Sequence, residues 1–218
     1  MKKTSLIMLA VIFTTAVFAQ NEKFVKAMEP KVAALDTTHS TDALLDLANA
    51  FERIAVAEKT EWLPYYYAAL SHVNAALIMG STDPMAGNAA KTDPHADKAE
   101  ELLNKAIALT KDNSELWIVK KQIATLRMMG DPMNRYMTYG PEASKALDQA
   151  RKLDPENPRV YLLDGQDKFY TPEQFGGSKS EAKKLFETAL AKYDTFKAAS
   201  SIHPGWGKGQ AQYFMSQL

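Results

Sequence analysis

No cysteine occurs among the 218 residues of the chain. Disulfide bonds and cysteine nucleophiles are therefore excluded, and stability must come from the packing of side chains. No low-complexity segment and no run of like charges marks a boundary between domains. We expect one elongated domain, since residues 20–218 are numerous enough to bury a core of that kind.

An excess of charge of either sign is also absent. Lysine and arginine together number 26, and so do aspartate and glutamate. Without Lys2 and Lys3, which lie in a segment that we expect to be removed, the net charge is −2. Neither nucleic acid nor an anionic membrane surface is an expected partner, because nothing in this balance attracts them.

Motifs of the common enzyme classes are missing as well. The sequence has no glycine-flanked serine, no His-Glu-x-x-His zinc helix and no glycine-rich phosphate loop. No two histidines have the spacing of three or four residues that places two ligands on one helix face. The histidines are His39, His72, His95 and His203. We therefore expect no enzymatic activity, no metal site and no cofactor.

The first nineteen residues have the features of a secretory signal peptide. A basic start, Lys2-Lys3, precedes an apolar run over residues 6–18, and the segment ends in Val-Phe-Ala. Signal peptidase accepts small residues near its cut, and the run is short for a bilayer span. We interpret residues 1–19 as a cleaved signal peptide; an uncleaved N-terminal anchor is the alternative. The exported protein is expected in the periplasm, with secretion as the other destination, and without stable insertion in a membrane.

One spacing of small and large apolar residues recurs four times. Each instance is an alanine, a leucine or phenylalanine four residues later, and an alanine three residues after that. On a helix this spacing places all three side chains on one stripe, which suits close packing against another backbone. The instances are Ala43/Leu47/Ala50, Ala99/Leu103/Ala106, Ala143/Leu147/Ala150 and Ala182/Phe186/Ala189.

Capping residues and prolines predict an all-α fold. Asp93-Pro94 and Asn157-Pro158 each offer a capping oxygen followed by a ring with helical φ, so each predicts the start of a helix. No segment alternates with the period of two that a strand requires. The predicted helices cover roughly residues 21–35, 41–58, 61–79, 94–110, 114–129, 141–153, 157–170, 178–196 and 205–217.

Residues 146–165 resemble the junction between two tetratricopeptide repeats. Tyr161 follows Ala143 by eighteen residues, and Trp117 follows Ala99 by the same distance, so two junctions agree in register. The positions that match the second helix of one repeat and the first helix of the next are Ala143, Leu147, Ala150, Pro155, Tyr161 and Gly165. The resemblance is to the tetratricopeptide repeat family, and in particular to its exported bacterial members.

The resemblance implies a right-handed α-solenoid of about four helix pairs with a C-terminal capping helix. The repeat signature recurs after 56, 44 and 39 residues, which is longer than the family's thirty-four. We therefore expect long loops between the two helices of each pair, over residues 80–93, 130–141 and 171–178. Such loops would project from one edge of the stack and form a second candidate surface.

In this family the first helix of each pair lines the concave face. The resemblance places four residues there, of which the two glutamines could hydrogen-bond an extended peptide. They are Ile118, Gln122, Leu162 and Gln166. The consecutive residues Tyr65, Tyr66 and Tyr67 lie on another first helix and cannot all face the core, so at least one should face the groove. The alternatives are that two tyrosines are core residues and that the glutamines are only solvated.

The segment Phe175-Gly176-Gly177 is the most distinctive element outside the repeats. Two glycines allow a sharp turn before Ser178 caps the next helix. The insertion is similar to that of exported tetratricopeptide proteins and, loosely, to the periplasmic helper of certain solute transporters. We expect Phe175 to fold back as a plug on the repeat core, with a role in gating a ligand as the alternative.

These observations predict a non-enzymatic, exported scaffold that binds a peptide or protein partner on its concave face. A periplasmic helper of a solute transporter, binding a small molecule, is the alternative function. The repeat signature names neither the partner nor the oligomeric state.

Overall fold

The computed structural model describes residues 22–80 and 86–218, and these contain helices but no strand. The expected signal peptide, residues 1–19, lies outside the described residues. Residues 22–37 are helical. The later elements are α2 (Thr41–Glu58), α3 (Trp62–Met79), α4 (Ala89–Leu109), α5 (Ser114–Gly130), α6 (Pro132–Leu153), α7 (Pro158–Tyr170), the short 3-10 helix η1 (Glu173–Phe175), α8 (Lys179–Thr195) and α9 (Lys208–Ser216). The all-α class predicted from the sequence is confirmed.

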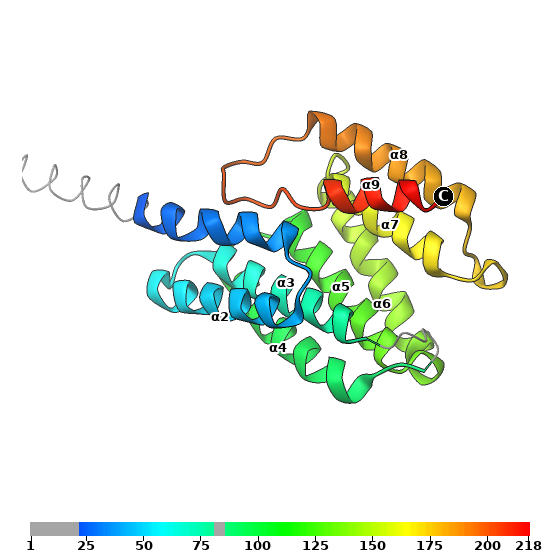
Figure 1. Cartoon of the computed structure of the whole chain (residues 1–218), viewed down its shortest axis with the longest axis horizontal. Coiled ribbons are helices and arrows are strands. Elements are labelled where there is room, and N and C mark those ends of the chain that lie inside the picture. The colour runs from blue at the N-terminus through cyan, green and yellow to red at the C-terminus, as the bar shows by residue number, and fades with distance from the viewer. Residues whose placement is uncertain (1–21, 81–85) are drawn as a thin grey trace, which may run out of the picture.

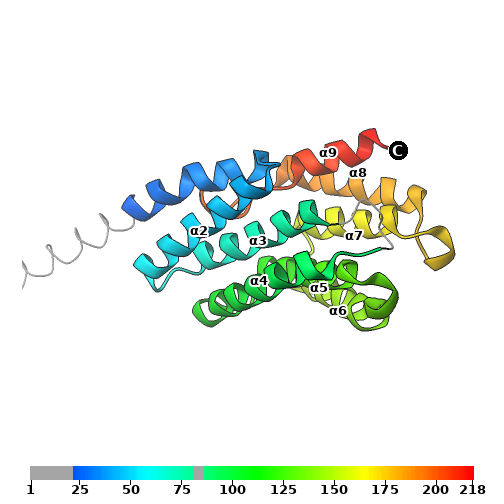
Figure 2. The ribbon, with the colours of Figure 1, turned by 60° about the horizontal axis from the view of Figure 1, so that its bottom comes forward.

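Neighbouring helices pair and stack in chain order. α3 packs against α2 and α4, α5 packs against α4 and α6, and α7 packs against α8. Figures 1 and 2 show the pairs side by side, with α9 lying back along α7 and α8. This arrangement is the helical-repeat architecture expected from the signature.

Side-chain caps begin several helices where the sequence predicts a start. In α5 the side chain of Asn113 accepts a hydrogen bond from the backbone N–H of Leu116. Asn157 caps α7 in the same way, and Pro158 follows it as the first helical residue. Ser178 caps α8, as expected. Each cap satisfies a backbone N–H that has no partner within its helix.

Three of the four alanine stripes are buried. Every residue of the stripes in α4, α6 and α8 is at most 5% exposed. In α2 the stripe that begins at Ala43 is only half-buried, so its register was wrong by one residue. The buried stripe of α2 consists of Leu44, Ala48, Phe51 and Ala55. A shift of one residue turns the helix by 100°, and the ring of Phe51 then stacks on Tyr67 at 5.2 Å between centroids.

Of the three expected loops, 130–141 is helical except at Asp131, and the last five residues of 80–93 are helical. α4 begins at Ala89 instead of Pro94, and α6 begins at Pro132 instead of Pro141, so the additional residues lengthen the second helix of each pair. A proline inside a helix removes one hydrogen bond to the carbonyl four residues earlier. Those carbonyls belong to Ala90 and Met137, which are both exposed and therefore accessible to water. The third expected loop is present between α7 and α8.

Residues 196–207 connect α8 to α9 without regular secondary structure, and we call them the C-terminal strap. In Figure 1 the strap leaves α8, runs toward the N-terminal helices and turns back into α9. Its residues Ile202 and Trp206 are buried. The backbone N–H of Gly207 donates to Asp36 Oδ1 at 3.2 Å, so the strap joins the two ends of the helical stack.

Candidate binding groove

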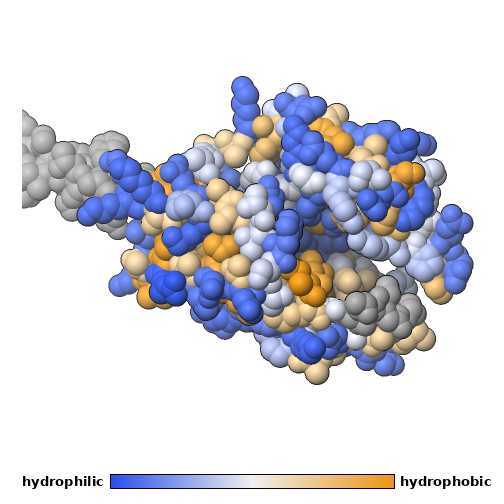
Figure 3. Space-filling model, viewed as in Figure 1, coloured by the Kyte–Doolittle hydropathy of each residue, from blue (hydrophilic) through white to orange (hydrophobic). Residues whose placement is uncertain are grey.

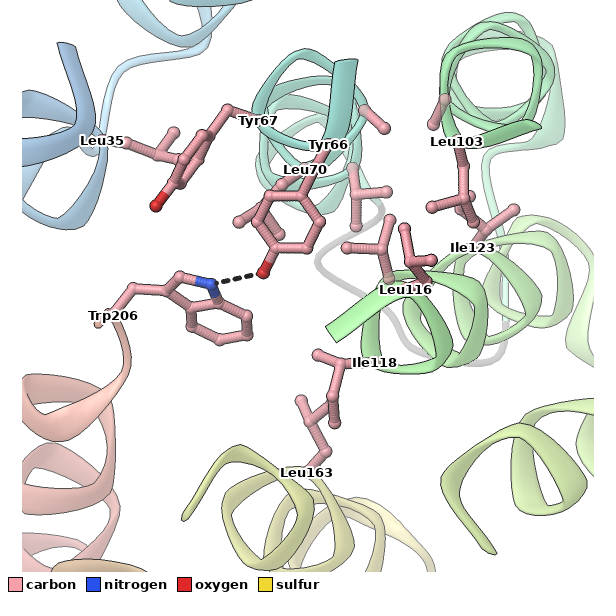
Figure 4. Close-up of a cluster of buried hydrophobic side chains, with 14 of the residues drawn as sticks. Leu35, Tyr66, Tyr67, Leu70, Leu103, Leu116, Ile118, Ile123, Leu163 and Trp206 are labelled. Atoms are coloured by element: carbon pink, nitrogen blue, oxygen red, sulfur yellow. Dashed lines mark hydrogen bonds between the residues drawn. The ribbon is translucent and has the colours of Figure 1, made fainter. Parts of the chain in front are cut away.

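The C-terminal strap covers the part of the concave face that the first turns of α3, α5 and α7 form. Trp206 Nε1 donates to Tyr66 Oη at 2.9 Å, with the indole ring pointing toward α3 and α5 (Figure 4). Tyr67 Oη donates to the carbonyl of Ile202 at 2.9 Å. Tyr193 of α8 donates to the carbonyl of Trp206, also at 2.9 Å. Three tyrosines from two helices therefore fix the strap in place.

A buried ion pair lies beneath the strap. Arg159 is 1% exposed, and its Nη2 and Nε lie 2.6 and 3.0 Å from Glu115 Oε1. Glu115 also accepts from Tyr66 Oη at 3.1 Å, and Arg159 Nη1 donates to the carbonyl of Trp206 at 3.4 Å. Burial and the charge of Glu115 raise the pKa of Tyr66, which is therefore a neutral donor at pH 7. The charges of the pair are satisfied within the fold and are not available to a ligand.

Four of the seven residues expected on the groove surface lie in the core. Tyr66, Tyr67, Ile118 and Leu162 are at most 1% exposed. The strap bonds to Tyr66 and Tyr67, and its Gly207 lies against Leu162. Ile118 points toward Leu163 of α7 (Figure 4). Tyr65 is half-buried and packs against the core from the edge of the stack. For these residues the expected contact with a partner was wrong, because the C-terminal segment takes the place of the partner.

The remaining part of the concave face is open. Figure 3 shows a hollow between the layer of α7 and α9 and the layer of α3 and α5, with hydrophobic atoms on one rim. Leu77 and Met129 lie eleven residues after Tyr66 and Ile118, so they continue the concave faces of α3 and α5 beyond the strap. Their exposed fractions are 39% and 42%. We call this region the open groove. The exposed or partly exposed residues that the bordering helices offer are Leu77 of α3, Met129 of α5, Gln166 and Tyr170 of α7, and Gln210 and Tyr213 of α9.

The two expected glutamines differ in their exposure. Gln166 is half-buried, and its Nε2 donates to Gln210 Oε1 of α9 at 3.4 Å. Gln122 is 8% exposed, and its Oε1 is buried without a hydrogen-bond partner. The carboxamides of α7 and α9 therefore meet at the open groove, whereas that of α5 is enclosed by the fold.

Aromatic side chains gather where α7 and α9 end. Tyr170 lies one turn beyond Gln166, and Tyr213 lies one turn beyond Gln210. Both rings contact Phe214, at 5.7 and 5.5 Å between centroids. Tyr170 and Tyr213 are nevertheless 69% and 59% exposed. Partial burial and the neighbouring Tyr213 raise the pKa of Tyr170, so it presents a neutral phenol. Sequence reasoning missed this pair, because α7 and α9 are far apart along the chain.

The segment Phe175-Gly176-Gly177 does not form the expected plug. Phe175 is 63% exposed and covers no core residue. Gly176 has φ of 92°, and a Cβ on Gly177 would lie 1.7 Å from the carbonyl oxygen of Thr171. Both glycines are therefore required by the turn itself. The loop leads the chain from α7 into the N-cap of α8.

No three histidine, aspartate or glutamate side chains come together as metal ligands in the described part of the chain. Two histidines do meet: His72 Nδ1 of α3 lies 3.2 Å from His95 Nδ1 of α4. An open depression of about 360 Å³ lies between Trp117 and α6, and its other lining residues are mainly polar. None of the helices in residues 22–80 and 86–218 has the length and hydropathy of a bilayer-spanning helix.

Stacked helix pairs with a partly covered concave face define a protein of helical-repeat architecture. No family model matches the sequence, so the assignment to tetratricopeptide repeats stays an interpretation. No curated protein sequence matches either. The solved structure of the HusA haemophore from Porphyromonas gingivalis is similar, with 33% identity and a TM-score of 0.77 over 89% of this chain and 92% of that chain. The chain belongs to the family of this haemophore.

Proposed function

We propose that the protein binds haem, without catalysing a reaction, in the open groove. The observation that carries the proposal is the membership in a family that includes a haemophore, at 33% identity over nearly the whole length. The protein is accordingly proposed to act outside the cytoplasm, either in the periplasm or after secretion, as the apolar N-terminal segment also indicates. The small-molecule alternative drawn from the sequence is thus the better supported one.

The chemistry of the open groove suits a flat, largely apolar ring. Leu77 and Met129 offer partly exposed apolar surface, and Tyr170 and Tyr213 offer aromatic faces. Aromatic and thioether side chains pack well against extended π-systems. A tyrosine phenolate is a known haem-iron ligand, but the raised pKa of Tyr170 favours its neutral form. We therefore propose ring packing as the role of Tyr170.

An extended peptide is the less favoured ligand for the concave face. The strap already occupies the first turns of α3, α5 and α7, where a peptide along the whole face would have to lie. A protein partner elsewhere on the molecule stays compatible with the proposal.

Titration of the purified protein with haemin, followed by the Soret band, tests the proposal. We expect saturable binding with one class of site, and we expect the double substitution Tyr170→Ala and Tyr213→Ala to weaken it by about tenfold or more, because two aromatic contacts are removed. Tyr136→Ala is the matched control, since Tyr136 is a half-exposed tyrosine of α6. Absence of saturable binding to the wild-type protein would contradict the proposed function.

A further inference from the structure

Four of the ten methionines of the chain lie close together, where α5 ends and α6 begins. They are Met128, Met129, Met133 and Met137. Met133 and Met137 are 73% and 81% exposed, so the hydrophobic core does not account for a large apolar side chain at either position. Single exposed apolar residues are common on proteins, whereas a cluster of them marks a site of interaction. The chemistry of sulfur therefore becomes relevant here.

Met133 and Met137 share one face of α6, because four residues advance an α-helix by little more than one turn. Their Cβ atoms are then about 5–6 Å apart. A methionine side chain has three rotatable bonds, so both sulfur atoms can turn toward one bound ion. Gly140 follows Met133 by seven residues and continues the same face. A glycine at this position leaves the space beside Met137 uncovered.

A third sulfur atom reaches this face of α6 from α5. A Cβ added to Gly140 would lie 3.8 Å from Met128 Sδ, and 3.6 Å from a ring carbon of Tyr136. Met128 is half-buried, and its sulfur therefore lies at the end of the row that Met133 and Met137 form along α6. We call Met128, Met133 and Met137 the thioether cluster.

The charged residues around this turn are paired with one another. Arg135 Nη1 lies 2.7 Å from Asp93 Oδ1, and Asp131 Oδ2 accepts a hydrogen bond from Asn134 Nδ2 at 2.9 Å. Calcium and magnesium require several oxygen ligands, and zinc takes thiolate, imidazole or carboxylate ligands. A thioether is a neutral and soft ligand, which selects Cu(I) among the biological metal ions.

We infer that the thioether cluster binds a monovalent soft cation, Cu(I), through the sulfur atoms of Met128, Met133 and Met137. Binding releases no proton, because a thioether is neutral and has none to lose. The affinity should therefore stay constant between about pH 6 and 8, unlike that of a site made of histidine or cysteine. The cluster includes no residue of the open groove, so the ion site is independent of the proposed function.

Titration of the purified protein with Ag(I), in a chloride-free buffer and without haem, tests the inference with a redox-stable analogue of Cu(I). Native mass spectrometry should show one bound ion per chain. With ¹³C-labelled methionine methyl groups, the NMR signals of Met128, Met133 and Met137 should shift together as the site fills, and that of Met215 should not. Met215, a partly buried methionine of α9, is thus an internal control.

Met133→Leu and Met137→Leu should each weaken Ag(I) binding by at least about tenfold, since even the loss of a group that only supports a metal ligand has an effect of that size. Both positions are exposed and leucine is also apolar, so the fold is retained, which circular dichroism verifies. Met215→Leu is the matched control variant and should bind as the wild type does. Competition with bicinchoninate should rank the variants in the same order for Cu(I).

A wild-type protein that binds no Ag(I), or that shows its methyl shifts outside the thioether cluster, would overturn the inference. The same holds if the double variant Met133→Leu with Met137→Leu binds Ag(I) as tightly as the wild type. In that case the sulfur of Met128 would only pack beside the ring of Tyr136. A different ranking of the variants with bicinchoninate would refute the assignment to Cu(I). None of these results bears on haemin binding in the open groove.

Discussion

Gly165 of α7 lies against the ring of Phe186 of α8 more closely than any other residue type would allow. A Cβ at this position would lie 2.5 Å from Phe186 Cε1, and both residues are buried. The small residue of the first helix and the large residue of the second therefore set the spacing between α7 and α8. Both residues occupy repeat positions of the sequence pattern, but the contact between them is visible only in the fold.

Gly165→Ala should destabilise the protein by about 1–3 kcal/mol, since an added methyl group has to displace a buried ring. Gly209→Ala is the matched control: Gly209 lies in α9 with nothing within 4 Å of an added Cβ. That substitution should stabilise the protein by about 0.5–1 kcal/mol, because alanine has the higher helix propensity. Urea unfolding of both variants measures the difference, and an unchanged midpoint for Gly165→Ala would show that α7 and α8 pack less closely than described.

At the scale of the element, two histidines join α3 to α4. His72 and His95 are 3.2 Å apart at Nδ1, and His72 Nε2 is buried without a hydrogen bond. Glu52 of α2 lies 3.8 Å from His72 Nε2 and is itself paired with Lys98 of α4, which also contacts Glu101. Burial lowers the pKa of both histidines, and for His72 the neighbouring His95 lowers it further. The junction of α2, α3 and α4 therefore favours the neutral form of both imidazoles.

Because of these two histidines, the free energy of unfolding should decrease as the pH is lowered. The unfolded histidines take up protons near their ordinary pKa of about 6.5, whereas the folded ones resist protonation until a lower pH. Their contribution is thus complete above about pH 6.5 and is lost as the pH falls toward the folded pKa values. Replacing both histidines, His72→Gln with His95→Gln, should flatten the dependence of the free energy of unfolding on pH between 7.5 and 5.5. His39→Gln, at an exposed position, is the control; an equal slope in the double variant would assign the dependence to other groups.

The whole molecule is held together by the C-terminal strap. Its residues contact α3, α7 and α8 and reach the end of the helical segment 22–37, which are distant from one another in the chain. Trp206 is the centre of this arrangement, with the guanidinium carbon of Arg159 5.6 Å from its ring. The strap also divides the concave face into a covered part and the open groove.

Trp206→Ala should cost about 3–5 kcal/mol in the free energy of unfolding, since a large buried side chain is removed. Trp206→Phe should cost less, because it keeps most of the ring and removes only the hydrogen bond to Tyr66. Trp117→Ala provides the comparison, as Trp117 is only half-buried. Thermal unfolding followed by circular dichroism ranks the three variants. Equal losses for Trp206→Ala and Trp117→Ala would mean that the strap is not an integral part of the fold.

Local sequence patterns were sufficient to predict the helices, several of their caps and three of the four buried stripes. The reason is that capping and helical periodicity depend on residues within a few positions of one another. The lengths of α4 and α6 were underestimated, because Pro94 and Pro141 were interpreted as helix starts. Both prolines lie inside their helices, where the carbonyl that loses its hydrogen bond belongs to an exposed residue. The repeat register predicted that Gln122 and Gln166 face the groove; Gln166 is partly exposed and Gln122 is buried.

The extent of the groove followed from contacts that no local pattern encodes. Tyr66 and Trp206 are 140 positions apart and Asp36 and Gly207 are 171 apart, and only the folded chain brings them together. The same holds for Tyr170 beside Tyr213 and for His72 beside His95. Periodicity reports which face of a helix is apolar, but it does not report whether solvent, a ligand or a distant segment of the same chain covers that face. For this protein the amino-acid sequence by itself determined the repeated helices, and tertiary packing decided which part of the concave face stays open.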